Sequence, residues 1–398
     1  MKAKLIVFLS FAISLCMAES LDYLVKPNGS YLVSSISYNW VNTNICPDPF
    51  YNKKDDFFFQ KNNKHCHIVN VRLFYPVSSP DKLVYQNYYQ DDIKQVQFDI
   101  ITKQIESKNI KFAEKYIHEE EKRPSYTLVP AMPANGKFPL IIFQPAFGIS
   151  SNFYQNIITN LVSNGYIIAA IDSGYSQPIF SESGNILSTS TFEFSNGQSS
   201  LWKPNSNIAE TTSDFKFVLS NLKQLDKADL VVRHIDFTNI GALGHSLGAR
   251  SVYFNALENT SRVAAAVALD IGRDKTLLIN KKIDIPFLYI NAADSPSSDK
   301  KMYGKSSSFL LGANNSLIIM TPSESNIDYS KHMSFADYPT LKYDEKLNQL
   351  YSLSYGIKYG NEQTTEYYGT ANGFEFFNKL NTYLLDFFNK NLKKATKK

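Results

Sequence analysis

The sequence predicts an α/β fold with a mostly parallel central sheet, helices on both faces of the sheet and an N-terminal extension. From about residue 138, short and continuously apolar runs alternate with segments of helical periodicity. Such runs are typical of strands buried on both faces, as in a parallel sheet covered by helices. Hydrophobic residues make up 43% and charged residues 20% of the 398-residue chain, an ordinary balance for a globular protein with a large core.

The expected strands are the apolar runs themselves. In chain order they are FPLIIF (138–143), GYIIAAID (165–172), NIGAL (239–243), VAAAVALD (263–270), IPFLYIN (285–291) and SLIIMTP (316–322). Earlier in the chain, HIVNVRLFYPV (67–77) alternates between apolar and polar residues, as a strand does when one face is buried.

Helices are expected between these strands. The segment SNFYQNIITNLVSNG (151–165) begins with Ser and Asn, which favour helix N-termini, and ends at a glycine. The segment AETTSDFKFVLSNLKQL (209–225) places its apolar residues on one helical face, and so does a closing helix that includes residues 377–388.

A Ser-, Gly- and Asn-rich stretch, residues 173–207, lies between two of the expected elements and contains several aromatic residues. It is too long for a plain connection, and we expect it to form a lid or rim beside the functional site. An insertion without a function is the alternative.

The N-terminus has the layout of a secretory signal peptide. Two lysines precede an apolar run from Leu5 to Met17, and small and polar residues follow it. The run is shorter than the roughly 20 residues that span a bilayer, which favours cleavage after Ala18 over an anchor helix. Residues 1–18 are therefore the predicted signal peptide of a secreted or periplasmic protein. Residues 19–398 are the predicted single domain, in which 19–130 hold the N-terminal extension and the first strands.

Two cysteines, Cys46 and Cys66, remain once the signal peptide is removed. An even pair in an exported protein most often forms a disulfide, and this bond is the prediction here. Two unrelated thiols are one alternative. Metal ligation by Cys66 with His65 and His67 is a weaker one, because no second Cys-x-x-Cys pair completes a site.

A serine lies between two glycines where an expected strand meets an expected helix. The segment GHSLG (244–248) matches the nucleophile-elbow pattern in that context. So sharp a turn brings neighbouring backbone very close, and only small residues fit at positions 244 and 248. The turn would raise the Ser246 hydroxyl into a cleft and leave the Leu247 amide at a helix N-terminus, where it can hold an oxyanion.

A nucleophilic serine needs a base that is oriented by an acid. In folds that carry such an elbow, the three residues follow one another along the chain in the order serine, acid, histidine. Among the six histidines, only His332 follows the elbow, so His332 is the predicted base. Asp270 ends one expected strand and Asp294 follows the next, so both should lie at the carboxyl edge of the sheet. Their spacing alone does not separate them.

Several motifs resemble the platelet-activating-factor acetylhydrolase (lipoprotein-associated phospholipase A2) branch of the α/β-hydrolases. These are GHSLGA at the elbow, VALDIG after it and HMSFADYP near His332, with VRLFYPV and SDFKFVLSNL as further similar segments between about residues 67 and 340. The resemblance implies an α/β-hydrolase fold with Ser246 as nucleophile, Asp270 as acid and His332 as base. Asp294 would instead match the secreted cutinase and polyester-hydrolase branch.

The resemblance also implies that the second oxyanion amide comes from the loop after FPLIIF. By position that amide belongs to Phe147. The family usually has His-Gly in this loop, whereas this chain has Pro145-Ala146, which leaves the loop geometry and the substrate range open.

The function implied is that of a secreted serine esterase, acting on phospholipids with short or oxidised sn-2 acyl chains. A general carboxylesterase or polyester hydrolase is one alternative, and a non-catalytic binding protein on a hydrolase scaffold is another. The expected partner is a lipid or small-molecule ester, and aromatic residues near the expected lid could meet a lipid surface. A net charge of +4 with scattered lysines argues against nucleic-acid binding. No metal or cofactor is expected.

Overall fold

The structure is a computed structural model, and it describes residues 21, 23–48, 65–79, 82–88, 123–177, 179–180, 186–187, 194–195, 198–199, 204–225, 229–271, 283–292, 315–320, 330–341 and 369–393. The predicted signal peptide, residues 1–18, lies outside these residues. None of the helices within them combines the length and the apolar character that a membrane crossing requires.

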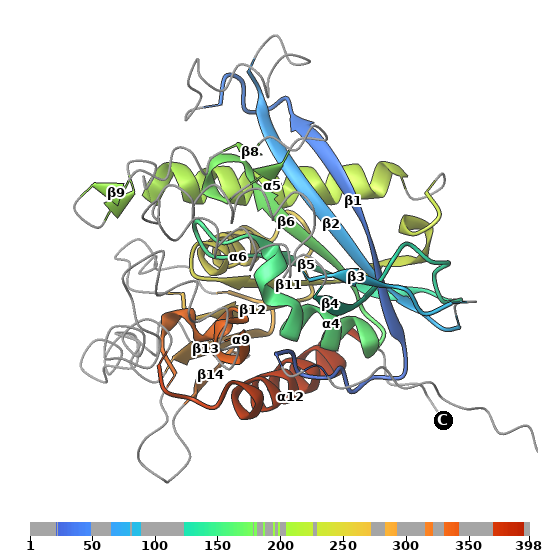
Figure 1. The fold of residues 1–398 in the computed structure, drawn as a ribbon. Helices are drawn as coiled ribbons and strands as arrows, with labels where there is room; N and C mark the ends of the chain where they lie inside the picture. Colours follow the sequence, from blue (N-terminus) through green and yellow to red (C-terminus); the bar gives the residue numbers. More distant parts are fainter. Residues whose placement is uncertain are drawn as a thin grey trace, which may run out of the picture.

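The strands of the described residues assemble into one large sheet in the order β14-β13-β12-β11-β5-β6-β2-β1-β4-β3 (Figure 1). Their bounds are β1 Leu32–Asn42, β2 His67–Val77, β3 Tyr85–Asn87, β4 Pro124–Leu128, β5 Phe138–Gln144, β6 Ile167–Ser173, β11 Ile235–His245, β12 Ala265–Leu269, β13 Phe287–Ala292 and β14 Asn315–Met320. The expected strands are present, most of them displaced by one or two residues from the apolar runs that predicted them.

The sheet is parallel from β6 through β5, β11, β12 and β13 to β14. Strand β2 is antiparallel to both of its neighbours, β6 and β1. The predicted mostly parallel sheet is therefore confirmed, with its antiparallel part built by the N-terminal strands. The carboxyl ends of the parallel strands share one edge, where ligands bind in folds of this kind.

Helices cover both faces of the sheet, as predicted. Helices α4 (Gln155–Ser163) and α12 (Gly373–Leu392) pack on one face, in the same core as Phe143. Helices α5 (Pro204–Leu225) and α6 (Leu247–Glu258) pack on the other face, with Ile142. Neighbouring strand residues thus enter different cores, because side chains alternate between the two faces of a sheet. Figure 1 shows α5 and α12 on opposite sides of the sheet.

The helix expected at residues 151–165 is divided. It begins as a 3-10 turn, Ser151–Tyr154, capped by the side chain of Ser150, and continues as α4. Phe153 has non-helical backbone angles, which separates the two parts. Gly165 follows with a φ of +83°, a conformation that glycine adopts readily and that ends the helix.

About half of the stretch expected to form a lid, residues 173–207, lies outside the described residues. Its described part includes two short strand pairs. Strand β7 (Ile179–Phe180) pairs with β8 (Ile186–Leu187), and β9 (Phe194–Ser195) pairs with β10 (Gln198–Ser199). The closing helix α12 begins at Gly373, where the side chain of Asn372 accepts hydrogen bonds from the amides of Phe374 and Glu375.

Candidate active site

Ser246 lies in the turn between β11 and α6, at the carboxyl edge of the sheet. Its backbone has φ 53° and ψ −110°, a conformation that non-glycine residues rarely adopt. A Cβ atom at position 244 would lie 2.3 Å from the Gly248 oxygen, and one at position 248 would lie 2.0 Å from the Gln144 oxygen. Both positions therefore require glycine, for the reason that the sequence motif suggested.

The structure brings the hydroxyl of Ser246, the imidazole of His332 and the carboxylate of Asp270 into one chain of contacts. His332 Nε2 lies 2.9 Å from Ser246 Oγ, and His332 Nδ1 lies 2.5 Å from Asp270 Oδ2. In the neutral tautomer with its proton on Nδ1, His332 donates to Asp270 and accepts from the serine hydroxyl. This is the arrangement in which an imidazole can remove a proton from a serine.

The three residues come from sequence positions far apart, and the parallel strands hold two of them together. Ser246 follows β11, and its amide donates to the Leu269 oxygen at the end of β12 (3.0 Å). Asp270 follows β12, and its amide donates to the Ile290 oxygen of β13 (2.8 Å). In addition, the Ala292 amide donates to Asp270 Oδ1 (3.3 Å), which fixes the carboxylate that faces His332. The alternative acid, Asp294, lies outside the described residues.

His332 begins a 3-10 turn, His332–Phe335, and its side chain is 43% exposed, whereas that of Asp270 is 3% exposed. The imidazole is thus partly exposed, and a buried carboxylate holds it at Nδ1. A buried carboxylate beside Nδ1 stabilises the charged imidazole that forms when His332 takes a proton.

The loop after β5 is bonded to the elbow. The Gly248 amide donates to the Pro145 oxygen (3.1 Å), so this loop lies directly against the start of α6. The Leu247 amide belongs to the first turn of α6, where N–H groups have no acceptor within the helix. Both features are compatible with an oxyanion site next to Ser246.

Phe147 lies within the same loop and is partly buried. The amide before it, that of Ala146, donates to the Tyr154 hydroxyl (3.1 Å), and the amide after it, that of Gly148, donates to the Ser176 oxygen (2.8 Å). These two bonds fix the loop on both sides of Phe147. The oxyanion roles of Phe147 and Leu247 stay predictions.

The elbow histidine, His245, is fully buried and contacts the predicted base. Its ring centroid lies 4.8 Å from that of His332, and its Nδ1 lies 2.8 Å from the Tyr154 hydroxyl. Burial, together with the neighbouring His332, lowers the pKa of His245 to about 3. His245 is therefore neutral near pH 7, and its ring packs against that of His332. Sequence reasoning did not identify its contact with Tyr154.

A second residue that sequence reasoning missed is Asp337, five positions after His332. This buried carboxylate accepts hydrogen bonds from the amides of Gln155 (2.8 Å) and Asn156 (3.0 Å) and from the Tyr88 hydroxyl (2.8 Å). It thereby fastens the turn that carries His332 to the N-terminus of α4, where a negative charge is favourable. Burial raises the pKa of Asp337 to about 6, although these hydrogen bonds act in the opposite direction. The available sequence signal was the Phe-Ala-Asp segment at residues 335–337, shortly after the histidine.

Comparison with known proteins agrees with this architecture. A family model described as platelet-activating factor acetylhydrolase, isoform II, matches residues 26–176. Among solved structures, a ferulic acid esterase from Streptomyces cinnamoneus superimposes with a TM-score of 0.67 at 19% sequence identity, covering 93% of this chain and 95% of the other. No curated protein matches the chain.

These matches confirm the resemblance to the platelet-activating-factor acetylhydrolases and the α/β-hydrolase fold. The family match begins earlier than the sequence motifs suggested and ends at residue 176, before the elbow. It includes the loop that contains Phe147 but not Ser246, Asp270 or His332. Together, the family match and the fold support a serine-type ester hydrolase.

Proposed function

We propose that this protein is an exported serine esterase that hydrolyses carboxylic esters through Ser246, His332 and Asp270. The observation that carries the proposal is the continuous contact from Asp270 Oδ2 to His332 Nδ1 (2.5 Å) and from His332 Nε2 to Ser246 Oγ (2.9 Å). A binding protein on the same scaffold has no need for a strained serine backbone beside an imidazole, so this geometry favours catalysis.

The acylation step uses the contacts of this site. Ser246 Oγ attacks the ester carbonyl carbon while His332 Nε2 takes the hydroxyl proton. Asp270 holds the ring and stabilises its positive charge, and the amides of Leu247 and Phe147 donate to the oxyanion of the tetrahedral intermediate. The bond between the carbonyl carbon and the alcohol oxygen then breaks, and the departing alcohol takes the proton from His332.

Deacylation repeats the same steps with water. His332 removes a proton from the water as its oxygen attacks the acyl-serine carbonyl, and it returns that proton to Ser246 Oγ when the acid is released. Both halves of the reaction need one base that is open to the cleft. The partial exposure of His332 meets this requirement.

The preferred substrate class in this proposal is a phospholipid with a short or oxidised sn-2 acyl chain. The family match to the acetylhydrolases supports it. A general carboxylesterase or polyester hydrolase is the second candidate, since the superimposed Streptomyces protein is a ferulic acid esterase. Export of the protein is supported by the disulfide between Cys46 and Cys66 and by the signal-like N-terminus. Transient contact with a lipid surface would bring the phospholipid to the site.

The decisive test of the chemistry is covalent labelling with a fluorophosphonate probe, which reacts with activated serines. We expect one label, located on Ser246 by peptide mass spectrometry, and no label in Ser246→Ala or in heat-unfolded protein. A folded wild-type protein that takes no label, or takes it elsewhere, would contradict the proposal. Ser251→Ala is the matched control. Ser251 is a buried serine of α6, the helix that begins directly after Ser246, and its hydroxyl donates to Gln144 Oε1.

The substrate class requires a separate measurement. Initial rates are compared for p-nitrophenyl esters of increasing chain length, a feruloyl ester and a phospholipid with an sn-2 acetyl group. We expect the highest kcat/KM for short acyl chains and for the acetylated phospholipid. A preference for long chains or for the feruloyl ester would favour the general carboxylesterase, and a labelled serine without any turnover would favour a binding protein.

A further inference from the structure

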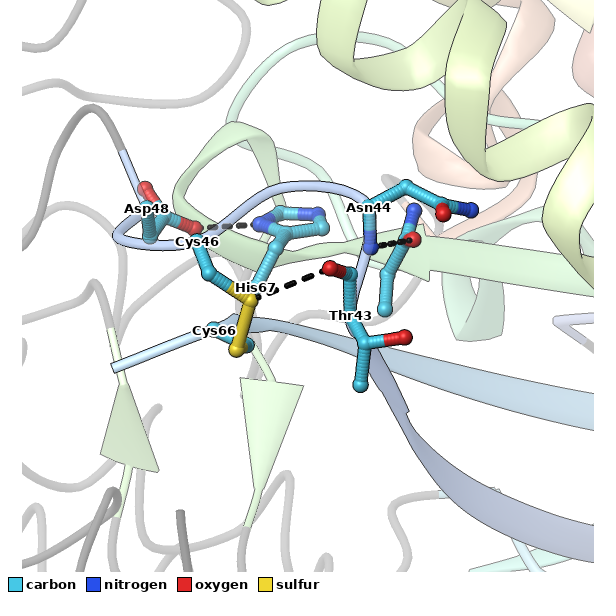
Figure 2. Close-up of a disulfide and its surroundings, with 7 residues drawn as sticks. Thr43, Asn44, Cys46, Asp48, Cys66 and His67 are labelled. Atoms are coloured by element: carbon cyan, nitrogen blue, oxygen red, sulfur yellow. Dashed lines mark hydrogen bonds and ion pairs between the residues drawn. A yellow bond between two sulfur atoms is a disulfide. The ribbon is translucent and has the colours of Figure 1, made fainter. Parts of the chain in front are cut away.

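A second cluster of titratable side chains lies at the same edge of the sheet, on the side of β2. Asp48, His67, Glu210 and Asp214 are all buried, with at most 3% of each residue exposed. They come from three segments: the loop closed by the Cys46–Cys66 disulfide, the first residue of β2, and helix α5. Figure 2 shows Asp48 and His67 facing one another beside the disulfide. The proposed ester hydrolysis uses none of these residues.

Both ring nitrogens of His67 face carboxylates. Nδ1 contacts Asp48 Oδ2, while Nε2 lies 2.8 Å from Asp214 Oδ2 and 3.2 Å from Glu210 Oε1. One nitrogen can carry only one proton, so it cannot satisfy two carboxylate oxygens. Glu210 Oε1 is indeed buried and has no hydrogen-bond donor among the described residues. The carboxylates of Glu210 and Asp214 thus both face His67 Nε2, and the oxygen without a donor, Glu210 Oε1, is one of the two atoms that face it.

The charges of the cluster do not balance. Glu210 and Asp214 both face Nε2 of one imidazole, and these two carboxylates carry more negative charge than a protonated His67 balances. Within the described part of the chain, His67 is the only cationic group in ion-pair contact with Glu210 or Asp214. Buried charge without full compensation destabilises a protein, so a further cation would be stabilising.

We propose that this cluster is a zinc site, with His67 Nε2, Glu210 Oε1 and Asp214 Oδ2 as ligands. The oxygen-to-nitrogen separations of 2.8 and 3.2 Å are close to the distance of about 3.3 Å between two ligands on a tetrahedral zinc with bonds of about 2.0 Å. One donor atom each from Asp48, His67 and Glu210 lies within 4.8 Å of the others, so the cluster is compact, but Asp48 contacts Nδ1 and is not one of the three proposed ligands. Asp48 then accepts from Nδ1–H and orients the ring, as a carboxylate beside a metal-bound histidine commonly does.

The donor set selects zinc over the hard cations. An imidazole ligand suits zinc, whereas calcium and magnesium take oxygen ligands almost exclusively. Sequence analysis expected no metal and considered ligation by Cys66 with His65 and His67 only as a weaker alternative. Cys66 is bound to Cys46, so its sulfur is not a thiolate ligand, and the partners of His67 are carboxylates from a distant helix.

The site is structural and separate from the ester-hydrolysing site. Strands β5 and β6 lie between β11 and β2, so the cluster is three strand spacings from the elbow, or about 14 Å. Zinc would join α5 to β2. It would also hold Ser176, whose hydroxyl donates to Glu210 Oε2 (3.1 Å) and whose backbone oxygen accepts from the Gly148 amide (2.8 Å). The inference does not depend on the proposed esterase activity.

The test measures zinc binding directly in the full chain, stripped with EDTA with its disulfide intact. Competition against a chromophoric chelator should give one tightly bound zinc per molecule, undisturbed by a thousand-fold excess of calcium. Saturating zinc should raise Tm by about 5 °C. Glu210→Gln and His67→Gln should each weaken binding at least ten-fold. Glu258→Gln and His234→Gln, which change residues outside the cluster, should bind zinc as the wild type does.

The proposal would be overturned if the wild-type protein bound no zinc, or if the Glu210→Gln variant bound zinc as well as the wild type does. The cluster would then be a group of buried side chains held together by shared protons and without a metal. Circular dichroism shows whether each variant folds. Should the variants not fold, X-ray absorption of the zinc-loaded wild type decides the question. One imidazole nitrogen with oxygen donors supports the site, and several imidazoles or any sulfur in the first coordination sphere refutes it.

Discussion

At the scale of single residues, Ser246 and Asp270 both hold backbone conformations with positive φ, 53° and 40°. Such conformations cost of order 1–3 kcal/mol each in a non-glycine residue and persist only where the surrounding structure enforces them. In both residues they follow a parallel strand and direct the side chain toward His332. Positive φ also occurs at His65, Asn259 and Arg262, but two residues whose side chains the proposed reaction uses share it.

The choice of acid gives the first prediction at this scale. Asp270→Asn keeps the shape of the side chain but removes its charge and disturbs the His332 tautomer, so kcat should fall by about 10⁴-fold. Asp294→Asn is the matched control and should leave kcat within about two-fold of the wild type. Rates with a p-nitrophenyl ester decide between them, and a loss of turnover in the control alone would transfer the role to Asp294.

The second prediction at this scale concerns His245. Its pKa is about 3 in the folded protein against 6.5 in a free side chain. Below pH 6.5 the unfolded chain therefore binds a proton that the folded protein does not, so this residue lowers stability as the pH falls. The expected slope is about 1.4 kcal/mol per pH unit between pH 6.5 and 3.

Urea unfolding at pH 7.0, 6.0 and 5.0 measures this slope. His245→Gln should show a shallower loss of stability on acidification than the wild type. His234→Gln, a change at a less buried histidine that lies next to the Gly136 oxygen, should behave like the wild type. Equal slopes in all three proteins would show that His245 is protonated in the folded state.

At the scale of elements, the contact between α4 and the turn that carries His332 depends on Asp337. Asp337→Ala leaves two backbone amides and the Tyr88 hydroxyl without their buried acceptor. It should lower stability by about 3 kcal/mol and lower kcat with little change in KM, because the base loses its support. Asp337→Asn should recover part of both losses.

Asp229→Ala is the matched control for this prediction. Asp229 also accepts from two backbone amides, of Val231 and Val232, and from a tyrosine hydroxyl, of Tyr38. It lies far along the chain from His332, so its loss should reduce stability but leave kcat unchanged. If both alanine variants lowered kcat to the same extent, Asp337 would have no positioning role.

At the scale of the whole molecule, the Cys46–Cys66 disulfide closes a loop over a sequence separation of 20 residues. A cross-link of that span stabilises a protein by about 3 kcal/mol, chiefly by restricting the unfolded chain. The Cys46→Ser, Cys66→Ser double variant should therefore unfold at a lower Tm than the oxidised wild type.

Differential scanning calorimetry of the double variant and of the wild type with and without dithiothreitol measures this effect. The reduced wild type should unfold at the Tm of the double variant, and dithiothreitol should not change the double variant. Because Asp48 lies inside the closed loop, loss of the disulfide should also weaken zinc binding. A double variant as stable as the oxidised wild type would show that the loop is already restricted by other contacts.

The amino-acid sequence by itself determined the parallel part of the sheet, the strand-to-helix turn at Ser246 and the choice of His332. These features depend on local chemistry: continuous apolar runs, glycine at two crowded positions, and the single histidine after the elbow. The resemblance to a known family favoured Asp270, but spacing alone left Asp294 open.

Only the tertiary structure decided which distant side chains meet. The contact of His245 with Tyr154, the support of the His332 turn by Asp337 and the gathering of three carboxylates around His67 join segments separated by 91, 181 and up to 147 residues. No local periodicity encodes such pairs, since they depend on the order of strands in the sheet and on the helix that covers each face. The strand order places β2 beside β6, and only then does a histidine from the first part of the chain face the carboxylates of α5.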